Sequence, residues 1–200
     1  MTENDFNRRQ QILNAAVKVF ARVGFAGATI KKIADEAGLK SPALIYWYFP
    51  NKQALFVAVV TELSPLLQRI AGDNRDLMAE PPQDVLLYFA QSAIAYVEHP
   101  GAGNLMRILF SEINQIEELM ESYATLQKMI LGFLTAYLQQ QIAAGRLKPH
   151  DPQVSARMFI GALLTYALSR HVFTWLAEGL PPGTEYAEQL VAHFLHGLQA

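Results

Sequence analysis

The sequence contains no cysteine among its 200 residues. This absence excludes a disulfide framework, a thiolate metal site and a cysteine nucleophile. Charged residues are also scarce, at 17% of the chain, whereas 52% of the residues are hydrophobic. That balance excludes an intrinsically disordered chain, which combines low hydrophobicity with a high net charge. We therefore expect a folded protein with one large domain or two small ones.

Long hydrophobic runs are missing as well. The longest apolar run, Met158 to Ser169, is shorter than the roughly 20 residues that cross a membrane as a helix. The N-terminal residues contain no apolar stretch followed by a small-residue cleavage site. We therefore expect a cytoplasmic protein without a membrane segment, and a buried helix at the apolar run.

Common enzyme motifs are absent from the sequence. It has no GxxxxGK[ST], GxSxG or HExxH motif, and no Glu-x-x-His pair of a di-iron bundle. His193 and His196 are three residues apart, but no third metal ligand lies near them in the sequence. We predict a protein that is not an enzyme and that uses neither a metal nor a cofactor.

The small net charge of −2 conceals an asymmetry along the chain. Residues 1–55 hold eight Lys and Arg against four Asp and Glu, a net charge of +4. The remaining residues hold eight bases against fourteen acids, a net charge of −6. A basic first quarter on an acidic body is typical of a polyanion-binding head, although chance also produces an excess of this size.

Helical periodicity is clear in the first 70 residues. Apolar residues recur at helical spacing from Ile12 to Val23, and Gly24 is placed to end that helix. Thr29 is the N-cap candidate of a second helix, which Gly38 ends.

Two further helices follow this pair. Ser41 and Pro42 have the residue types of an N-cap and a first helical position, for a helix that reaches about Phe49. Asn51 is the cap of a fourth helix, which we expect to run unbroken to about Ile70.

The rest of the chain also has helical spacing. A polar stretch, Gly72 to Glu80, precedes it, and no alternating strand pattern or fixed-period repeat is present. Residues 116–144 form either one long helix or a short one followed by a long one. We expect helices over about 83–98, 104–113, 116–144, 153–177 and 185–198, and hence an all-α fold.

The second and third helices form a candidate helix-turn-helix. Ala34 is small where two helices would cross, and Gly38 permits a left-handed turn. An ordinary corner between two helices explains this spacing equally well. In a DNA-binding helix-turn-helix, the second helix presents its N-terminal residues to the major groove.

Residues 24–56, GFAGATIKKIADEAGLKSPALIYWYFPNKQALF, closely resemble the DNA-binding segment of the tetracycline-repressor (TetR) family. One departure from the family pattern is an extra residue near Lys40. The positions that match are Gly24-Phe25, Thr29, Ile33-Ala34, Ala37-Gly38-Leu39, Tyr46, Tyr48-Phe49, Lys52 and Leu55.

The resemblance implies a three-helix DNA-binding domain followed by a helical domain for ligand binding and dimerisation. We place the first domain at residues 1–52, with its last helix extending to about 68, and the second at 53–200. The function implied is that of a homodimeric transcriptional regulator, a repressor that a small apolar ligand releases from a palindromic operator on double-stranded DNA. The alternative is a helical adaptor that binds a protein partner without DNA.

Candidate DNA-contacting residues have side chains suited to phosphates or base edges. The hydroxyl of Thr29 and the ammonium group of Lys52 suit phosphate, and Lys40 suits phosphate or a guanine edge. Ser41 suits a base or a phosphate, and Pro42 and Ala43 suit a thymine methyl group. For the tyrosines, core packing is the alternative. The full set is Thr29, Lys40, Ser41, Pro42, Ala43, Tyr46, Trp47, Tyr48 and Lys52.

Candidate ligand-binding residues are the large, soft and aromatic side chains of the later helices, which suit a shape-tolerant pocket. Ordinary core packing is the alternative for each. They are Met106, Phe110, Tyr123, Met129, Phe133, Tyr137, Tyr166, His171, Phe173 and Trp175.

Candidate dimer contacts come from the last two helices, because an apolar surface that wraps nearly around a helix is buried on all sides. Two such helices from each subunit form an isologous four-helix interface. The residues are Phe159, Leu163, Leu164, Leu168, Tyr186, Leu190, Phe194 and Leu198.

Overall fold

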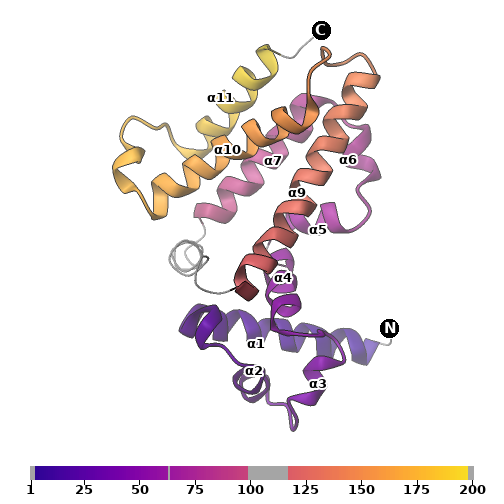
Figure 1. Ribbon diagram of the computed structural model, residues 1–200, viewed down its shortest axis with the longest axis vertical. Helices are drawn as coiled ribbons and strands as arrows, with labels where there is room; N and C mark the ends of the chain where they lie inside the picture. The colour runs from indigo at the N-terminus through magenta and orange to yellow at the C-terminus, as the bar shows by residue number, and fades with distance from the viewer. Residues whose placement is uncertain (1–2, 63, 99–116, 198–200) are drawn as a thin grey trace. The chain divides into compact units, whose positions relative to one another are not determined.

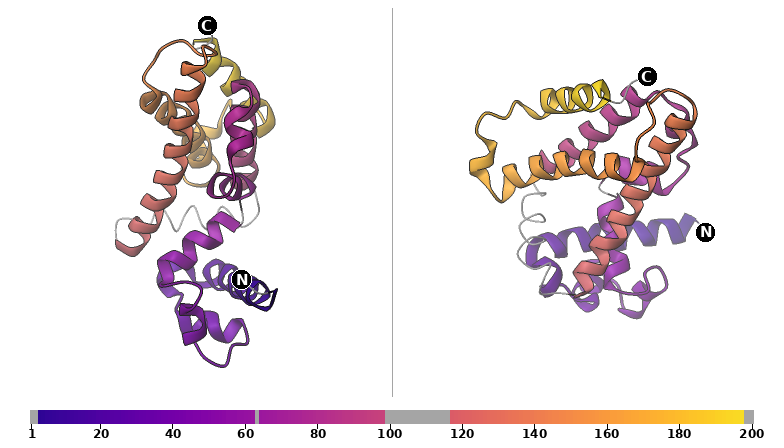
Figure 2. Two further views of the ribbon diagram at one scale, coloured as in Figure 1. Left: turned by 90° about the vertical axis from the view of Figure 1, so that its right-hand side faces the viewer. Right: turned by 45° about the horizontal axis from the view of Figure 1, so that its top comes forward.

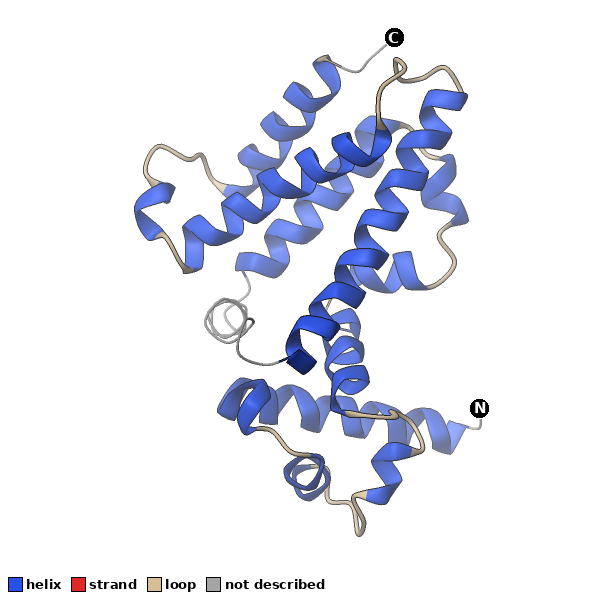
Figure 3. Cartoon of the chain, viewed as in Figure 1, coloured by secondary structure: helices blue, strands red, loops and turns tan. Residues whose placement is uncertain are grey.

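The computed structural model describes residues 3–62, 64–98 and 117–197, and these ranges are helical with no strand (Figure 1; Figure 3). The expected all-α fold is confirmed. The helices of the first part are α1 (Glu3–Gly27), α2 (Ile30–Glu36), α3 (Ala43–Tyr46) and α4 (Lys52–Glu62). Those that follow are α5 (Pro65–Ala71), α6 (Arg75–Ala79), α7 (Pro82–Glu98), α9 (Glu117–Ala143), α10 (Pro152–His171), the 3₁₀ turn η1 (Thr174–Ala177) and α11 (Gly183–His196).

Contacts divide the described chain into two compact units. The first unit contains α1 to α4 and the beginning of α9 as far as Leu126. The second contains α5, α6 and α7, the rest of α9, and α10 to α11.

The expected single helix from Lys52 to about Ile70 is wrong. Helix α4 ends at Glu62, and α5 begins at Pro65. Proline has no N–H to continue the ladder and disfavours the helical conformation in the residue before it. Ser64 accordingly has an extended backbone, and its hydroxyl accepts the N–H of Leu67 at 3.3 Å as an N-cap.

Three other expected elements also differ from the structure. The helix expected over 153–177 ends at His171, and a short 3₁₀ turn follows it. The helix expected to reach Phe49 is only four residues long. The polar stretch before α7 contains the short helix α6, because Leu77 is buried there.

Residues 117–143 form one long helix, and the helix expected at 104–113 lies outside the described residues.

Three aromatic rings form the centre of the first unit. Phe20 and Phe25 lie on either side of Gly24, whose φ of 72° breaks the helix where the sequence predicts its end. This break turns the Phe25 ring back onto Phe20, with centroids 5.9 Å apart. Phe56 of α4 meets both rings edge-on, at 5.3 and 5.2 Å.

Helices α7, α10 and α11 lie side by side in the second unit (Figure 1; Figure 2). Phe159 of α10 packs between Phe89 of α7 and Phe194 of α11, with centroid distances of 6.0 and 5.1 Å. At the start of α11, Gly183 is buried. A Cβ atom added at Gly183 would lie 2.5 Å from the Ile94 side chain and 2.9 Å from the Tyr166 hydroxyl. Glycine therefore permits the close approach of α11 to α7.

The C-terminal end of α9 holds α6 through hydrogen bonds to its last carbonyl groups. The buried Tyr137 donates its hydroxyl to the Glu80 carbonyl at 2.9 Å, and Gln141 donates to the Met78 carbonyl at 3.1 Å. Arg146 donates to the Ala79 carbonyl at 3.3 Å. These side chains satisfy carbonyls that a helix end leaves without partners.

Substituting Gly183 by alanine tests the packing of α11 on α7. We expect Gly183→Ala to lower the free energy of unfolding by about 1–3 kcal/mol, because the new methyl group overlaps buried atoms. The melting temperature should fall by about 2–4 °C per kcal/mol for a chain of this length. Gly132→Ala is the matched control, since Gly132 lies inside α9 with no atom near an added Cβ. It should leave stability unchanged or raise it, and equal decreases in both variants would contradict the packing argument.

Candidate DNA-binding site

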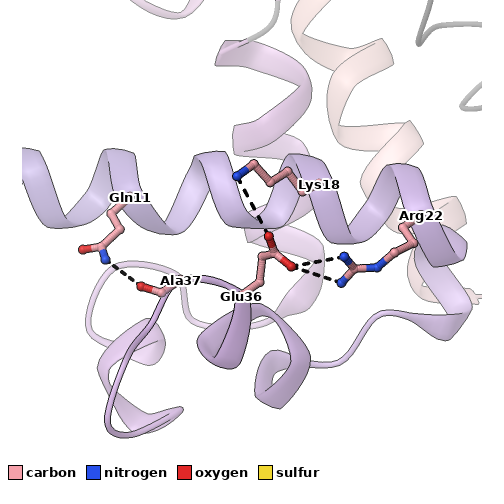
Figure 4. Close-up of polar contacts among 5 residues, drawn as sticks. All are labelled: Gln11, Lys18, Arg22, Glu36 and Ala37. Carbon is pink, nitrogen blue, oxygen red and sulfur yellow. Dashed lines mark hydrogen bonds and ion pairs between the residues drawn. The ribbon is translucent and has the colours of Figure 1, made fainter.

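The connection between α2 and α3 is a tight, hydrogen-bonded turn. Gly38 adopts a φ of 64°, and the N–H of Leu39 then donates to the Ala34 carbonyl at 2.9 Å. Gln11 of α1 donates its side-chain amide to the Ala37 carbonyl at 2.6 Å (Figure 4). The turn is therefore fixed both within itself and to α1.

An ion-pair cluster joins α1 to the end of α2 beside this turn. The Glu36 carboxylate accepts from both terminal nitrogens of Arg22 at 3.2 Å, and Lys18 lies 3.9 Å from it (Figure 4). Both basic side chains are well exposed, and exposed pairs contribute at most about 1 kcal/mol. The main attachment of α2 to α1 is the burial of Ile33 and Ala34.

Helix α3 presents most of its side chains to solvent. Only Ile45 of its four residues is buried, whereas Tyr46 is 54% exposed and Trp47, directly after the helix, is 85% exposed. At the start of α3, Pro42 has a helical backbone, and the Ser41 hydroxyl accepts the N–H of Ala43 at 3.2 Å. A short helix attached by one buried residue and the preceding turn leaves its outer face open to a partner.

Lys52 links the start of α4 to the end of α1. Its ammonium group donates to the Phe25 carbonyl at 3.2 Å and lies 4.2 Å from the centre of the Phe25 ring. This attachment fixes the position of the cation at the start of α4. Thr29 is exposed, and its hydroxyl accepts the N–H of Lys32 at 3.1 Å as the predicted N-cap.

All nine predicted DNA-contacting residues lie in the first unit, between the start of α2 and the start of α4. Thr29, Lys40, Pro42, Ala43, Tyr46 and Trp47 are exposed, and Ser41, Tyr48 and Lys52 are half-buried. Two neighbouring side chains are not among the predicted set. Leu44 is exposed because α3 is so short, and the guanidinium of Arg9 lies 5.4 Å above the Phe49 ring next to α3.

The predicted ligand-binding residues that the structure describes belong to both units. Tyr123 belongs to the first unit, whereas Met129, Phe133 and Tyr137 follow on α9 in the second. Tyr137 stacks on Phe133, and its hydroxyl is bonded to the Glu80 carbonyl. Burial raises the pKa of Tyr137, so the hydroxyl stays protonated and remains a donor. Met106 and Phe110 lie outside the described residues.

A second group of these residues lies where α10 meets the end of α7. Tyr166 donates its hydroxyl to Glu98 at 2.7 Å and accepts from Arg170, and the His171 ring nitrogen Nε2 lies 2.7 Å from the Val97 carbonyl. Burial, followed by the hydrogen bond to Glu98, raises the pKa of Tyr166. This polar cluster is held together by protein groups alone.

Trp175 and Phe173, which the sequence predicts to line a pocket, are both exposed. Trp175 is 71% exposed, and its ring contacts the ring of Phe173, which is also exposed. Helix α10 ends before them, so the 3₁₀ turn directs both rings to the surface of the second unit.

The predicted dimer contacts differ in how far they are buried within one protomer. Phe159 has no exposed surface and Leu163 is buried, because both pack inside a single protomer. Leu164, Leu168, Tyr186, Leu190 and Phe194 are half-buried, and Leu198 lies outside the described residues. The exposed apolar side chains of α10 are Val154 and Met158, four residues apart, and neither belongs to the predicted set.

The described ranges contain neither a metal site nor a membrane-spanning helix. No group of three or more His, Asp or Glu side chains there could hold a metal ion. No single described helix is both long and apolar enough to span a membrane. Helices α4 and α5 reach that length and composition only together.

A short exposed helix, fixed by a tight turn to the helix before it and flanked by lysines, defines a helix-turn-helix regulator that binds DNA. Residues 12–59 match the sequence profile of bacterial regulatory proteins of the tetR family. Residues 84–196, more than half of the chain, match the C-terminal domain of AefR-like transcriptional repressors. The chain therefore belongs to the tetR family, and it is a DNA-binding transcriptional regulator of the repressor type.

Similar proteins have the same role and fold. The HTH-type transcriptional regulator YhgD of Bacillus subtilis is 27% identical over 197 residues, which cover 97% of this chain and 98% of YhgD. A TetR-family regulator from Mesorhizobium loti superposes with a TM-score of 0.73 over the full length of both chains, at 22% identity. The regulator FadR of B. subtilis, solved with stearoyl-CoA, has a TM-score of 0.66 at 19% identity, covering 94% of this chain and 98% of FadR. The relatives are regulators, a non-enzymatic role.

Gln11 provides a test of how the turn is held. Gln11→Glu replaces the amide donor by a carboxylate facing the Ala37 carbonyl, so we expect the free energy of unfolding to fall by about 1–3 kcal/mol. Gln10→Glu is the matched control, because it adds the same charge one residue away on α1, where the Gln10 amide donates to the Asn14 side chain at 3.3 Å. Denaturant titration measures both. If the two variants are destabilised equally, the bond from Gln11 does not hold the turn.

Proposed function

We propose that this regulator acts as a homodimer on a palindromic operator and that a small apolar ligand releases it. The observation that supports this most directly is the exposed face of α3, which is fixed to α1 by the Gln11 bond and the Gly38 turn. A helix presented in this way suits the major groove of one half-site. One protomer then reads one half-site, and a two-fold dimer reads two.

The dimer contact is proposed on α10 and α11. Val154 and Met158 form an exposed apolar edge on α10, and the half-buried Leu190 lies on α11. Apolar surface of this kind gains stability when a second copy removes it from water. Tethering two heads raises the effective concentration of the second head at its half-site.

The ligand is proposed to bind in the second unit and to change the separation of the two heads. The chain leaves α4 at Glu62 and enters α5 after the Ser64 cap, so a break between two helices replaces the continuous helix that the sequence predicts. A coupling of about 1–3 kcal/mol changes operator affinity roughly 5- to 150-fold. Coupling is reciprocal, so operator DNA must weaken ligand binding by the same factor, which calorimetry with and without the duplex measures.

Selection from a library of random DNA duplexes tests the proposal. The full-length protein should enrich an inverted repeat whose half-site centres lie one helical turn, about 34–36 Å, or a multiple of it apart. A selected sequence without two-fold symmetry would contradict the homodimer on a palindrome. The adaptor without DNA, which the family assignment does not favour, is the outcome if no sequence is enriched.

Removing the ammonium group of Lys52 tests its proposed phosphate contact. Lys52→Ala should weaken binding to selected and random duplexes alike, because a phosphate contact carries no base information. The slope of log affinity against log salt should fall by about one for each phosphate that the variant no longer neutralises. Lys128→Ala, which removes an exposed lysine of α9 in the second unit, is the control. Weaker binding to the selected sequence alone would show that Lys52 contacts a base or positions α3 through Phe25.

Placing a charge on the exposed edge of α10 tests the dimer. Met158→Glu should convert the dimer to a monomer, since a two-fold axis brings two carboxylates into an apolar contact. Met158 is 65% exposed, so the change spares the protomer core, whereas Phe194 packs on Phe159 and is unsuitable. The control is Met120→Glu on the exposed surface of α9. Light scattering that finds Met158→Glu still dimeric would place the interface elsewhere.

A further inference from the structure

The segment that carries α3 contains few of the side chains that read base edges through paired hydrogen bonds. Residues 39–50, LKSPALIYWYFP, include one charged residue, Lys40, and no Arg, Asn, Gln, His, Asp or Glu. The exposed side chains of α3 and its start are Pro42, Ala43, Leu44 and Tyr46. The Ser41 hydroxyl is half-buried and accepts the N–H of Ala43.

Each base presents its own chemical groups in the major groove, and each of these side chains suits only some of them. Guanine is read by Arg or Lys, adenine by Asn or Gln, and cytosine by Asp or Glu. Thymine differs because it presents a C5-methyl group that apolar side chains contact. Lys40 is the one side chain of this segment that suits guanine, whereas Pro42 and Ala43 suit only the thymine methyl.

We propose that this regulator selects its operator chiefly through thymine methyl groups, contacted by Pro42 and Ala43 at the start of α3. This inference rests on the proposed function, since it requires α3 to lie in the major groove. Ala43 is the first residue of α3 and is exposed, and Pro42 precedes it with a helical φ of −58°. The N-terminal end of a recognition helix is the part that reaches base edges.

The backbone at this point is preorganised for such a contact. Ile45 is fully buried and donates its N–H to the Pro42 carbonyl at 3.1 Å. The Ser41 hydroxyl holds the N–H of Ala43. Pro42 and Ala43 thus lie on a segment held by hydrogen bonds at both residues. If the thymine methyl group is absent, this segment cannot move to close the gap.

Replacing thymine by uracil in the selected operator tests the proposal. Deoxyuridine removes the C5-methyl group and keeps every hydrogen-bonding group of the base. With the full-length protein, uracil at one or two positions of each half-site should weaken binding about fourfold for each methyl group removed. This is the change expected for one buried methyl-sized group. Uracil at thymines outside the protected sequence should change nothing.

The outcomes separate this inference from the proposed function. If no duplex is enriched by selection, the proposed function fails and this inference fails with it. If a palindrome is enriched but uracil has no effect at any position, the operator is bound and the thymine readout is wrong.

Ala43→Gly identifies the side chain that makes the contact. The variant should bring the affinity ratio of thymine to uracil close to one at a single position of each half-site, and leave the other sensitive position unchanged. Ala192→Gly removes the same methyl group from an exposed position of α11, far from α3 in the sequence, so it should leave every ratio unchanged. Unchanged ratios in Ala43→Gly would overturn the assignment to Ala43.

Discussion

The site depends on the attachment of a very short helix to a long one. The four residues of α3 cannot form a stable helix in isolation. The backbone entropy lost in forming the first turn exceeds the stability gained from its one hydrogen bond. The turn at Gly38, the bond from Gln11 to the Ala37 carbonyl and the burial of Ile45 supply what the helix lacks. Every exposed side chain of α3 is carried on a scaffold made elsewhere in the first unit.

The need for a scaffold outside α3 also explains the positions of Lys52 and of the cluster of Phe20, Phe25 and Phe56. Gly24 turns the chain so that Phe25 packs on Phe20 and Phe56, and the Phe25 carbonyl then accepts the ammonium group of Lys52. The start of α4 is therefore tied to the end of α1. Along the chain this link follows α3, whereas the Gly38 turn precedes it. The position of the Lys52 cation at this joint is set by packing within the first unit.

Much of this could be predicted from the sequence because local signals set it. The caps at Thr29 and Asn51 and the break at Gly24 are confirmed, since side-chain hydrogen bonds and positive φ values act within a few residues. The spacing of apolar residues does not predict the break after Glu62, because that spacing continues through Pro65. Spacing carries no information about the backbone N–H that proline lacks. The burial of Phe159 and the exposure of Trp175 could not be predicted, for a different reason. Hydrophobicity shows that a side chain avoids water but not which neighbour covers it, and that depends on contacts between α7, α10 and α11.

The central claim is that the exposed face of α3 meets DNA, and the two tryptophans of the chain allow a direct measurement of it. Trp175→Phe leaves Trp47, 85% exposed beside α3, as the one fluorescent indole. Titration with the selected duplex should shift the emission of Trp47 as water leaves the ring, with the same midpoint as an electrophoretic mobility shift. Trp47→Phe, which keeps Trp175 in the second unit, serves as the comparison. A duplex that binds fully while the emission of Trp47 stays unchanged would contradict the account.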